Sequence, residues 1–308
     1  LYDRQEQQLY LTRDRVGEKP LYYGMVNGAF AFASDIECIR QIEGFSNQVN
    51  RAVFPLYFQY GYIPAPYSIY EKIFKLEPGK TLRLNCKTLD YKIQTYWSMT
   101  EVALNGEKNR FTGSEEEAAG ELERLLKHAI RGQMIADVPL GAFLSGGIDS
   151  SLVVSLMQAI SPNKVKTFTI GFDVDKYNEA RYAKEIAAHL GTEHTELYVT
   201  SQDAFTIMQH MPDSFTEPFA DSSQIPTMLV SKMTREHVTV ALSGDAGDEL
   251  FCGYTTYMVA EEEMRKFRKR FHRIPAPLRH GAAKIGGALA GPFTPTLYKI
   301  GNYLAIDT

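Results

Sequence analysis

The sequence is poor in cysteine: its 308 residues include only Cys38, Cys86 and Cys252, which lie far apart. An odd, widely spaced set argues against a disulfide framework and is typical of proteins in a reducing compartment. The chain also shows neither a signal peptide nor an apolar run long enough to span a bilayer. These absences argue against disulfide-stapled secreted proteins and membrane-spanning proteins, and they favour a cytoplasmic location.

A strong net charge and a metal-ligand spacing are missing as well. The formal charge at pH 7 is −4, which gives no electrostatic reason to expect a nucleic-acid partner. The seven histidines are dispersed without an H-x-x-x-H spacing, so no zinc site is expected. The basic run 265–273 is interleaved with an apolar stripe of Met264, Phe267 and Phe271. An amphipathic helix with solvated charges is therefore favoured over a nucleic-acid contact.

The chain does contain a glycine loop between a predicted strand and a predicted helix. The apolar run 140–144 predicts a buried strand, Ser145-Gly146-Gly147 a tight turn, and the periodic residues from about 150 a helix. Backbone N–H groups in such a turn and the helix N-terminus form an anion site, and adjacent glycines let a phosphate approach closely. Ser145, Ser150 and Ser151 offer further hydroxyl donors. Asp149 would repel a bare phosphate, which suggests a metal ion between them.

This loop differs from the nucleoside-triphosphate P-loop because no lysine follows its glycines. The only Gly-Lys-Thr, at Gly79, has Phe74 where that motif requires its first glycine. By contrast, S-G-G-x-D-S at Ser145–Ser150 resembles the pyrophosphate loop of ATP pyrophosphatases, which cleave ATP to AMP and pyrophosphate. The alternative is an ordinary glycine turn between a strand and a helix.

Predicted strands and helices alternate through the second half of the chain. The polar stretch 98–113 predicts a linker, and a capping box at Ser114 and Glu117 opens the next helix. After it we expect strand 140–144, helix 150–160, strand 165–172, helix 178–190, strand 196–200, helices from 201 and across 225–236, and strand 238–242. The alternation predicts a doubly wound parallel sheet, in which ligands bind at the carboxyl ends of the strands.

Acidic residues gather after the last of these strands. In the segment Ser243–Glu249, three carboxylates fall within five residues, and their repulsion requires an offsetting charge. Magnesium carried by ATP would supply it, whereas the alternative is a solvated acidic turn. The loop Glu217–Ser223 is equally compatible with a capping segment and with part of an acceptor pocket. Glu179 is interpreted as a match to a helix dipole and not as a site residue.

Residues 1–97 predict a strand-rich part with two helices. Strands are expected at 8–12, 21–26, 29–33, 81–84 and 91–95, with Asn27-Gly28 as a two-residue hairpin turn. A capping box at Ser34 and Glu37 predicts a short helix, and a second helix is expected over 51–60, ending at Gly61. No catalytic pair is visible in this part, and Cys38 is interpreted as a packed thiol.

Together these motifs resemble the glutamine-dependent asparagine synthetases. Residues 144–151, 168–171, 217–221 and 243–251 are similar to that family's synthetase domain, and 13–23, 32–34 and 76–79 to the second half of its glutaminase domain. The resemblance implies an α/β fold with an ATP-pyrophosphatase (adenine nucleotide alpha hydrolase-like) domain over 114–308. It also implies a linker over 98–113 and a partial α+β N-terminal-nucleophile, class II amidotransferase domain over 1–97.

The resemblance also implies a role for each matching residue. Asp149, Asp245 and Asp248 would be catalytic, with Asp149 and Asp248 holding magnesium and Asp245 assisting adenylate formation. The nucleotide contacts would be Leu144 and Ile170 at the adenine, Ser145, Gly146, Gly147, Ser150 and Ser151 at the pyrophosphate, and Ser243 and Gly244 near the α-phosphate. Cys252 stands where the family usually has glycine, and is interpreted as packing.

The implied reaction is ATP-dependent synthesis of asparagine from aspartate, with glutamine or ammonia as nitrogen donor. It passes through β-aspartyl-AMP and releases AMP and pyrophosphate. The implied partners are these small molecules and magnesium, with no nucleic acid or membrane, and a homodimer is left open. Because the chain starts at Leu1 in mid-pattern, we expect a fragment whose glutaminase nucleophile lies upstream and which has no glutaminase activity by itself.

Two alternatives to this reaction remain. One is a related amidotransferase or β-lactam-synthetase-like enzyme that adenylates a different carboxylate. The other is a non-catalytic nucleotide-binding protein. Retention of Asp149, Asp245 and Asp248 argues against the second alternative, because a scaffold has no need of three mutually repelling acids.

Overall fold

The structure is a computed structural model that describes residues 1–172 and 179–271. The chain divides into two compact units. The larger unit comprises Leu1–Gly147 and Val153–Leu242, and the smaller one joins Ile148–Leu152 to the segment that starts at Ser243. In the part of the chain that is described, no helix combines the length and the apolar character needed to cross a membrane.

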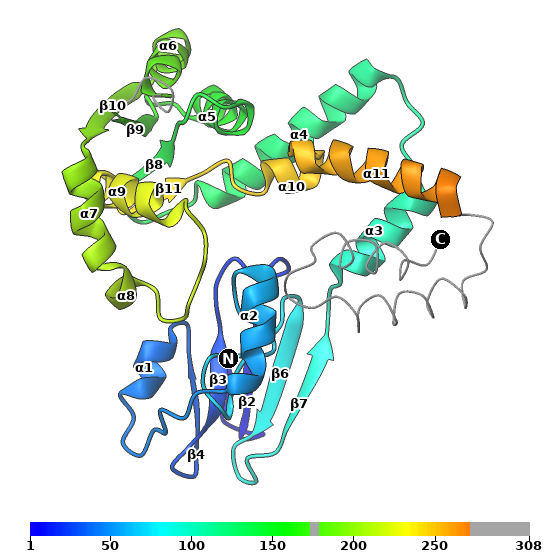
Figure 1. Cartoon of the computed structure of the whole chain (residues 1–308), viewed down its shortest axis with the longest axis vertical. Helices are drawn as coiled ribbons and strands as arrows, with labels where there is room; N and C mark the ends of the chain where they lie inside the picture. Colours follow the sequence, from blue (N-terminus) through cyan, green and yellow to red (C-terminus); the bar gives the residue numbers. More distant parts are fainter. Residues whose placement is uncertain (173–178, 272–308) are drawn as a thin grey trace. The chain divides into compact units, whose positions relative to one another are not determined.

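Two antiparallel sheets form the first part of the larger unit (Figure 1). One has the order β1-β2-β6-β7 and the other β4-β3-β5. Their bounds are β1 Tyr2–Asp3, β2 Gln8–Thr12, β3 Tyr22–Val26, β4 Ala29–Ala33, β5 Ile73–Lys75, β6 Lys80–Asn85 and β7 Tyr91–Thr95. The β3–β4 turn has positive φ at Asn27 (48°) and Gly28 (78°), the backbone that Asn-Gly favours. The predicted strands are confirmed to within one residue at each end, and β1 and β5 are additional.

The helices of this part correct two predictions. Helix α1, Ile36–Arg40, is capped by Asp35, whose carboxylate accepts the Glu37 N–H at 2.8 Å. The predicted Ser34 cap is therefore wrong, because an aspartate one residue later caps equally well. Cys38 is exposed and not packed, since Ile36 and Ile39 supply the buried face of this helix.

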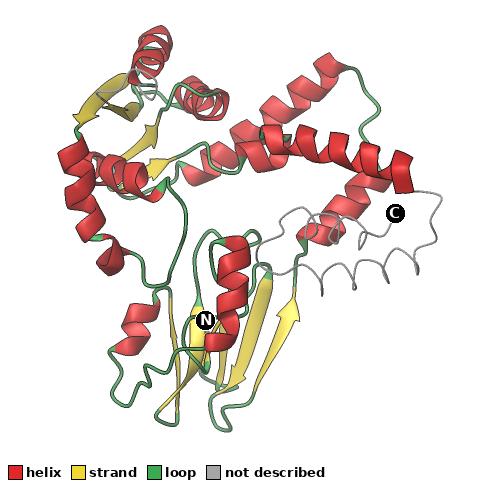
Figure 2. Cartoon of the chain, in the orientation of Figure 1, coloured by secondary structure: helices red, strands yellow, loops and turns green. Residues whose placement is uncertain are grey.

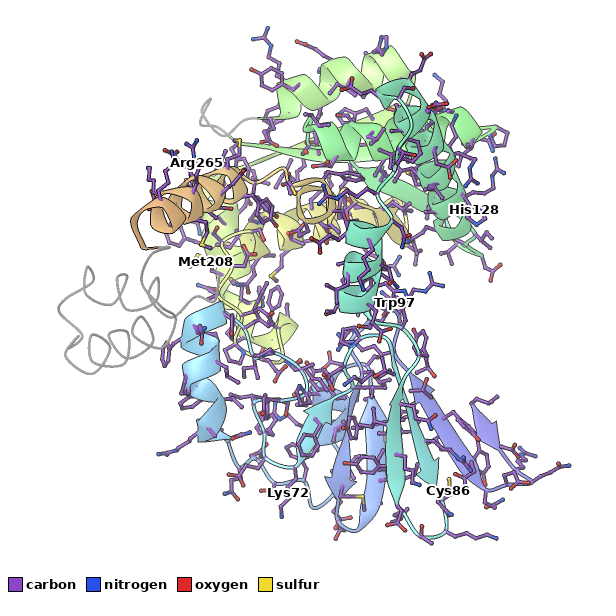
Figure 3. The ribbon with its side chains drawn as sticks, turned by 90° about the vertical axis from the view of Figure 1, so that its right-hand side faces the viewer. Lys72, Cys86, Trp97, His128, Met208 and Arg265 are labelled. Atoms are coloured by element: carbon purple, nitrogen blue, oxygen red, sulfur yellow. The ribbon has the colours of Figure 1, made fainter. Side chains whose placement is uncertain are left out.

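The next helices follow the predictions more closely. A 3₁₀ turn, Arg51–Val53, leads into α2, Phe54–Tyr60, which ends at Gly61 with φ 77° as predicted. Lys80 begins strand β6 and no helix follows it, so Gly79-Lys80-Thr81 is not a phosphate loop. Figure 3 shows Cys86 and Trp97 at opposite ends of the β6–β7 hairpin.

Two helices separate these sheets from the parallel sheet. The stretch predicted as a linker contains α3, Met99–Lys108, whose N-cap Ser98 accepts the Glu101 N–H. Helix α4, Glu115–Gln133, begins with the predicted capping box. The Ser114 Oγ accepts the Glu117 N–H at 3.2 Å, and the Glu117 carboxylate accepts the Ser114 N–H at 2.8 Å.

The second sheet region is a four-stranded parallel sheet of order β10-β9-β8-β11. Its strands are β8 Leu140–Phe143, β9 Lys166–Phe172, β10 Glu193–Val199 and β11 Val240–Leu242. The connecting helices are α5 Ile148–Ile160, α6 Ala180–Leu190, α7 Ser201–Gln209, α8 Met211–Ser214 and α9 Gln224–Arg235 (Figure 2). The chain order reverses between β8 and β11, which are neighbours in space although α5, β9 and β10 intervene in sequence.

Helices cover both faces of this sheet because successive side chains of a strand point in opposite directions. Ala142 and Leu144 pack with Val154 of α5 and Ala183 of α6 in one cluster, together with Ile130 of α4. The intervening Phe143 packs in another cluster with Phe168 and with Val230 and Met233 of α9. The doubly wound parallel arrangement is thus confirmed.

In its described residues, which end at Phe271, the smaller unit contains the first turn of α5 and two further helices. These are α10, Gly247–Phe251, and α11, Thr255–Phe271. The helix predicted from the basic run 265–273 is confirmed up to Phe271 as part of α11, and residues 272 and 273 lie outside the described residues. Its predicted apolar stripe includes Phe267 and Phe271, whose side chains lie outside the described residues.

Candidate active site

The glycine loop begins at the carboxyl end of β8 and leads directly into α5. Gly146 has φ +86°, and a Cβ at this position would lie 2.8 Å from Tyr182 Cβ and 3.0 Å from the Ala183 nitrogen. The loop is therefore packed closely against the start of α6, and an L-residue would be strained there in backbone and in space. The sequence predicted this glycine for its approach to a phosphate. Its packing against α6 is a second reason, and only the structure shows it.

The turn itself presents backbone donors at the start of a helix of 13 residues. Gly147 is the N-cap residue of α5, and its N–H donates to the Ser145 Oγ at 3.2 Å. Ser150 and Ser151 lie in the first helical turn, where Ser150 is buried. The predicted order of strand, glycine turn and helix is confirmed, and it is an arrangement that favours bound anions.

A cavity of about 360 Å³ opens beside this loop, at the carboxyl ends of β8 and β9. Among the predicted nucleotide contacts it brings together Leu144, Ser145 and Ile170. Leu144 is only 1% exposed, because its side chain belongs to the core under α5. Thr227 of α9 and Glu179, the residue before α6, line the same cavity. Sequence reasoning assigned Glu179 to a helix dipole and did not anticipate this position.

The acidic segment begins at the carboxyl end of β11, the strand adjacent to β8. The Ser243 hydroxyl donates to the Asp245 carboxylate at 2.9 Å. Ala246 then adopts a left-handed conformation, with φ 72°, and α10 follows. Two polar loops thus leave neighbouring parallel strands at the point where the chain order reverses, which is the usual place for ligands in such sheets.

Within the smaller unit, the acidic segment packs against the first turn of α5 through two glycines. A Cβ on Gly244 would lie 2.7 Å from the Ser150 nitrogen, and a Cβ on Gly247 would lie 2.5 Å from Asp149 Oδ1. The Asp149 carboxylate therefore lies directly against Gly247, the residue before Asp248. Sequence reasoning missed the function of these glycines, which is to allow the close contact between the two segments.

The end of α10 corrects the interpretation of Cys252. This cysteine is exposed, and it is the C-cap residue with φ 58°. The position therefore favours glycine for its left-handed backbone and not for packing. The next residue, Gly253, lies against the Asp248 carboxylate, and its N–H donates to the Asp248 carbonyl at 3.0 Å. Tyr254 donates to Glu249 at 2.9 Å, and this hydrogen bond raises the pKa of the tyrosine to about 12.

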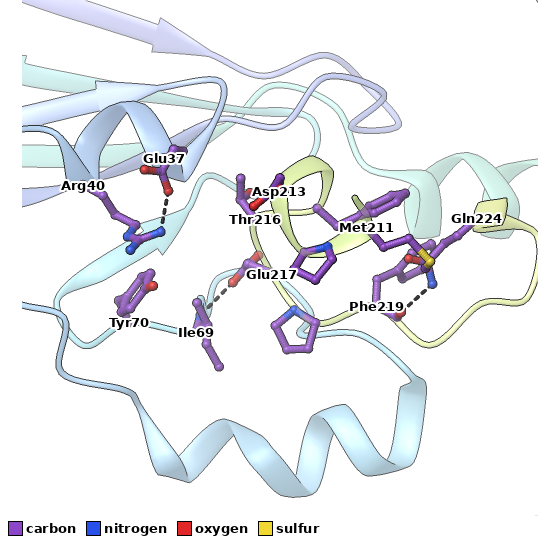
Figure 4. A pocket seen from close by; sticks show the side chains of 13 residues that line it. Glu37, Arg40, Ile69, Tyr70, Met211, Asp213, Thr216, Glu217, Phe219 and Gln224 are labelled. Carbon is purple, nitrogen blue, oxygen red and sulfur yellow. Dashed lines mark hydrogen bonds and ion pairs between the residues drawn. The ribbon is translucent and has the colours of Figure 1, made fainter. Parts of the chain in front are cut away.

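The loop Glu217–Ser223, predicted as either a capping segment or part of an acceptor pocket, forms the turn before α9 and lines a cavity, while its side chains make no N-cap hydrogen bond to α9. Asp221 accepts the Ser223 N–H at 2.8 Å, which lowers the pKa of the carboxyl and shapes the turn before α9. Glu217 and Phe219 line a cavity of about 730 Å³ together with Arg40 and Tyr70 of the first part (Figure 4). The Glu217 carboxylate, moreover, is engaged by residues of the first part, a set of contacts that the sequence did not suggest.

The described part of the chain contains no preformed set of three or more protein ligands for a metal ion, whether histidine, cysteine, aspartate or glutamate. Carboxylate oxygens such as those of Asp149 and Asp248 suit Mg²⁺, which needs only one or two protein carboxylates when substrate phosphates and water complete its shell. The residues present are thus chemically compatible with a phosphate-bound magnesium.

Comparison with known families gives two matches that divide the chain. Residues 121–293, more than half of it, match the model of the family described as asparagine synthase. Residues 1–97 match the model described as a glutamine amidotransferase domain.

Individual relatives carry corresponding names. A protein of Methanocaldococcus jannaschii provisionally named asparagine synthetase [glutamine-hydrolyzing] 2 is 36% identical over 84% of this chain and 49% of its own length. Asparagine synthetase [glutamine-hydrolyzing] 1 of Bacillus subtilis is 32% identical over 94% of this chain and 44% of its own length. The chain thus spans about half the length of the curated relatives it matches.

Solved structures are more distant. A glutamine-dependent NAD⁺ synthetase from Acinetobacter baumannii, solved with ADP, matches 62% of this chain and 34% of its own, with 19% identity and a TM-score of 0.34. NMN synthetase from Francisella tularensis matches 47% of this chain and 60% of its own, with 17% identity and a TM-score of 0.31.

Proposed function

We propose, because the chain belongs to the asparagine synthase family, that the protein containing it makes asparagine from aspartate and ATP. Glutamine is the nitrogen donor, with ammonia as its substitute, and AMP and pyrophosphate are released. The amidotransferase match over residues 1–97 supports the glutamine-dependent form. We place the reaction in the cytoplasm, with which the free thiols of Cys38, Cys86 and Cys252 agree.

The observation that carries this proposal is the pair of loops at the chain reversal. One provides backbone N–H groups and serines at the start of α5, and the other provides carboxylates after β11. Their contact at Asp149 and Gly247 brings an acid beside a helix N-terminus. An isolated acid there would weaken anion binding, whereas an acid that reaches a phosphate through magnesium strengthens it.

The chemistry follows in two steps. An oxygen of the aspartate side-chain carboxylate attacks the α-phosphorus of ATP, and the bond to pyrophosphate breaks, leaving β-aspartyl-AMP. The ammonia nitrogen then attacks the acyl carbon, AMP leaves and a proton is lost, giving the amide. Because negative charge develops on the departing pyrophosphate, fixed donors at that position stabilise the transition state.

Each loop residue has a proposed part in this sequence. Ser145, Gly146, Gly147, Ser150 and Ser151 hold the pyrophosphate, while Leu144 and Ile170 border the adenine at the cavity beside β8 and β9. Ser243 and Gly244 lie near the α-phosphate, and Asp245 assists formation of the adenylate. Asp149 and Asp248 hold magnesium, which when bound neutralises charge on the phosphates.

The test is aspartate-dependent exchange of labelled pyrophosphate into ATP, measured on the full-length protein. Asp149→Asn should lower the exchange rate about 10²-fold, as expected when one charged contact to the transition state is lost. Its melting temperature should stay close to that of the parent, because Asp149 is partly exposed and asparagine has nearly the same shape. Asp137→Asn, which changes an exposed aspartate just before β8, is the matched control and should alter neither quantity.

Three results would contradict the proposal. Exchange that persists in Asp149→Asn would show that the acid is not in the site. Release of ADP and phosphate would exclude adenylation, and exchange with a carboxylate other than aspartate would identify a different acceptor.

A further inference from the structure

A buried ion pair in the larger unit takes no part in the proposed chemistry. Lys75 Nζ of β5 lies 2.5 Å from Glu217 Oε2, and the two side chains are only 14% and 9% exposed. The Lys75 ammonium also donates to the Ile63 carbonyl at 2.6 Å. A charge pair so well shielded from water must have its hydrogen bonds satisfied to be tolerated, and this one has them.

The Glu217 carboxylate uses both of its oxygens. The Tyr22 hydroxyl donates to Oε2 at 2.8 Å, and the Ile69 N–H donates to Oε1 at 2.7 Å, as Figure 4 shows for Ile69. Tyr22 and Lys75 face each other in the register of β3 and β5. Their side chains therefore emerge on the same face, and together they form a pair of donors that binds one carboxylate.

From Glu217 the contacts continue to the start of α9. The Gln224 side-chain amide, buried at 6% exposure, donates to the carbonyls of Phe219 at 2.6 Å and Asp221 at 2.8 Å. Gln224 is the first residue of α9, and Pro226 and Thr227 in the same turn line the cavity beside β8 and β9. The loop 217–221 thus connects a strand pair of the amidotransferase-matched part to the wall of that cavity.

We propose that Lys75 and Tyr22 are positioning residues for the proposed nucleotide site. They hold Glu217, Glu217 holds the loop 217–221, and the loop fixes the first turn of α9 at the cavity. Without the Lys75 ammonium, a Glu217 carboxylate kept at its present position would carry an uncompensated charge shielded from water. We therefore expect the carboxylate to move into solvent and the loop 217–221 to become less ordered. The activity readout of this inference rests on the proposed function, whereas its structural readout does not.

The test uses the full-length protein and three lysine variants. Lys75→Met removes the ammonium and keeps most of the apolar stem, and Lys75→Arg keeps a cation able to bind the carboxylate. Lys80→Met is the matched control, because Lys80 pairs with Glu77 close by on the more exposed surface. Amide hydrogen exchange of peptides covering 217–227 and the KM for ATP in the pyrophosphate exchange assay are measured for each variant.

The rate of amide hydrogen exchange over residues 217–227 should rise about tenfold in Lys75→Met, while the rate over residues 180–190 should stay unchanged. The KM for ATP should rise about fivefold while kcat stays within twofold, since the altered cavity wall binds ground state and transition state alike. Lys75→Arg should restore both values, and Lys80→Met should change neither. If Lys75→Met does not fold, Tyr22→Phe, which keeps the ring and removes only the hydroxyl, should show smaller changes in the same direction.

The inference would be overturned if amide hydrogen exchange over 217–227 in Lys75→Met were as slow as in the parent protein. The same result in Tyr22→Phe would overturn it where that variant replaces Lys75→Met. The inference would also be overturned if Lys75→Arg changed hydrogen exchange and the KM for ATP as much as Lys75→Met does. A fall in kcat of Lys75→Met without a rise in its KM for ATP would overturn it as well. If the parent protein shows no pyrophosphate exchange, the proposed function fails, and hydrogen exchange alone still decides whether Lys75 holds the loop.

Discussion

Gly247→Ala should separate the function of the acidic segment from its contribution to stability. The added Cβ would lie 2.5 Å from Asp149 Oδ1, where ordinary contacts begin at 3.4 Å, so the carboxylate must retreat by roughly 1 Å. A misplacement of about 1 Å can cost about 10²-fold in rate. Gly247 is the first residue of α10 and its φ lies outside the left-handed region, so alanine introduces no backbone strain of its own.

The expected loss of stability is much smaller. The obstructing atoms are Cγ, Oδ1 and Cβ of Asp149, the latter two at 2.5 and 2.8 Å. Because they belong to one side chain on the first turn of α5, the overpacking falls in the lower half of its usual range, about 1–2 kcal/mol. For a chain of this size that corresponds to a fall in melting temperature of about 2–8 °C. The assay is aspartate-dependent pyrophosphate exchange, with thermal unfolding followed on the same preparations of full-length protein.

Gly120→Ala provides the control, because a Cβ at Gly120 in α4 would have no neighbour within 4 Å. Alanine is better than glycine inside a helix by up to about 1 kcal/mol, so this variant should be fully active and slightly more stable. Parental exchange activity in Gly247→Ala would refute the reasoning, since it would mean that the position of the Asp149 carboxylate does not matter. A fall of more than about 10 °C would also refute it, because the contact would then be part of the core.

Three further predictions concern the larger unit. Gly146→Ala should be more destabilising than Gly247→Ala in thermal unfolding. The left-handed φ of residue 146 would strain an alanine, and its Cβ would also press against the Ala183 backbone. Arg13→Lys should lower the free energy of unfolding by about 1–3 kcal/mol in urea, because one ammonium cannot serve the three carbonyls to which the guanidinium donates. Burial and, after it, the neighbouring Glu217 raise the pKa of Tyr22. The protonated Tyr22 hydroxyl therefore contributes fully to the free energy of unfolding below about pH 10, and this contribution is lost as the pH rises further. Urea midpoints from pH 8 to 11 should fall more steeply for the parent than for Tyr22→Phe.

Local patterns in the sequence predicted most elements of the fold. Asn27-Gly28, Gly61 and the Ser114 capping box each depend on a few neighbouring residues, and each was confirmed. Helix α3 was missed because its polar composition resembles that of a linker, and its stabilising cap is a single serine, Ser98. The Ser34 cap was wrong by one residue for a similar reason, since two capping residues stand side by side.

The candidate site was less predictable wherever it depends on contacts between distant segments. The motif at 145–150 predicted the loop and its helix, but not that Gly146 packs on α6. The acids of the segment after β11 were identified, whereas the contact of Gly247 with Asp149 requires knowing which strands are neighbours. The Glu217 contacts with Tyr22 and Lys75 have no local signature at all, because their geometry arises only when β3 and β5 pair. The roles of the individual site residues remain predictions.

The strand order has a consequence for biosynthesis. In the register of the sheet Leu140 pairs with Val240, so the glycine loop is translated roughly 100 residues before the acidic segment that packs against its helix. At about 5–20 residues per second, the interval is about 5–20 s. During that time β8, β9 and β10 can pair, but the edge of β8 on which β11 will lie stays open, and open strand edges invite pairing with other chains. Chaperone protection or slow translation over this interval should therefore affect the yield of folded protein more than the same treatment applied after β11 has emerged.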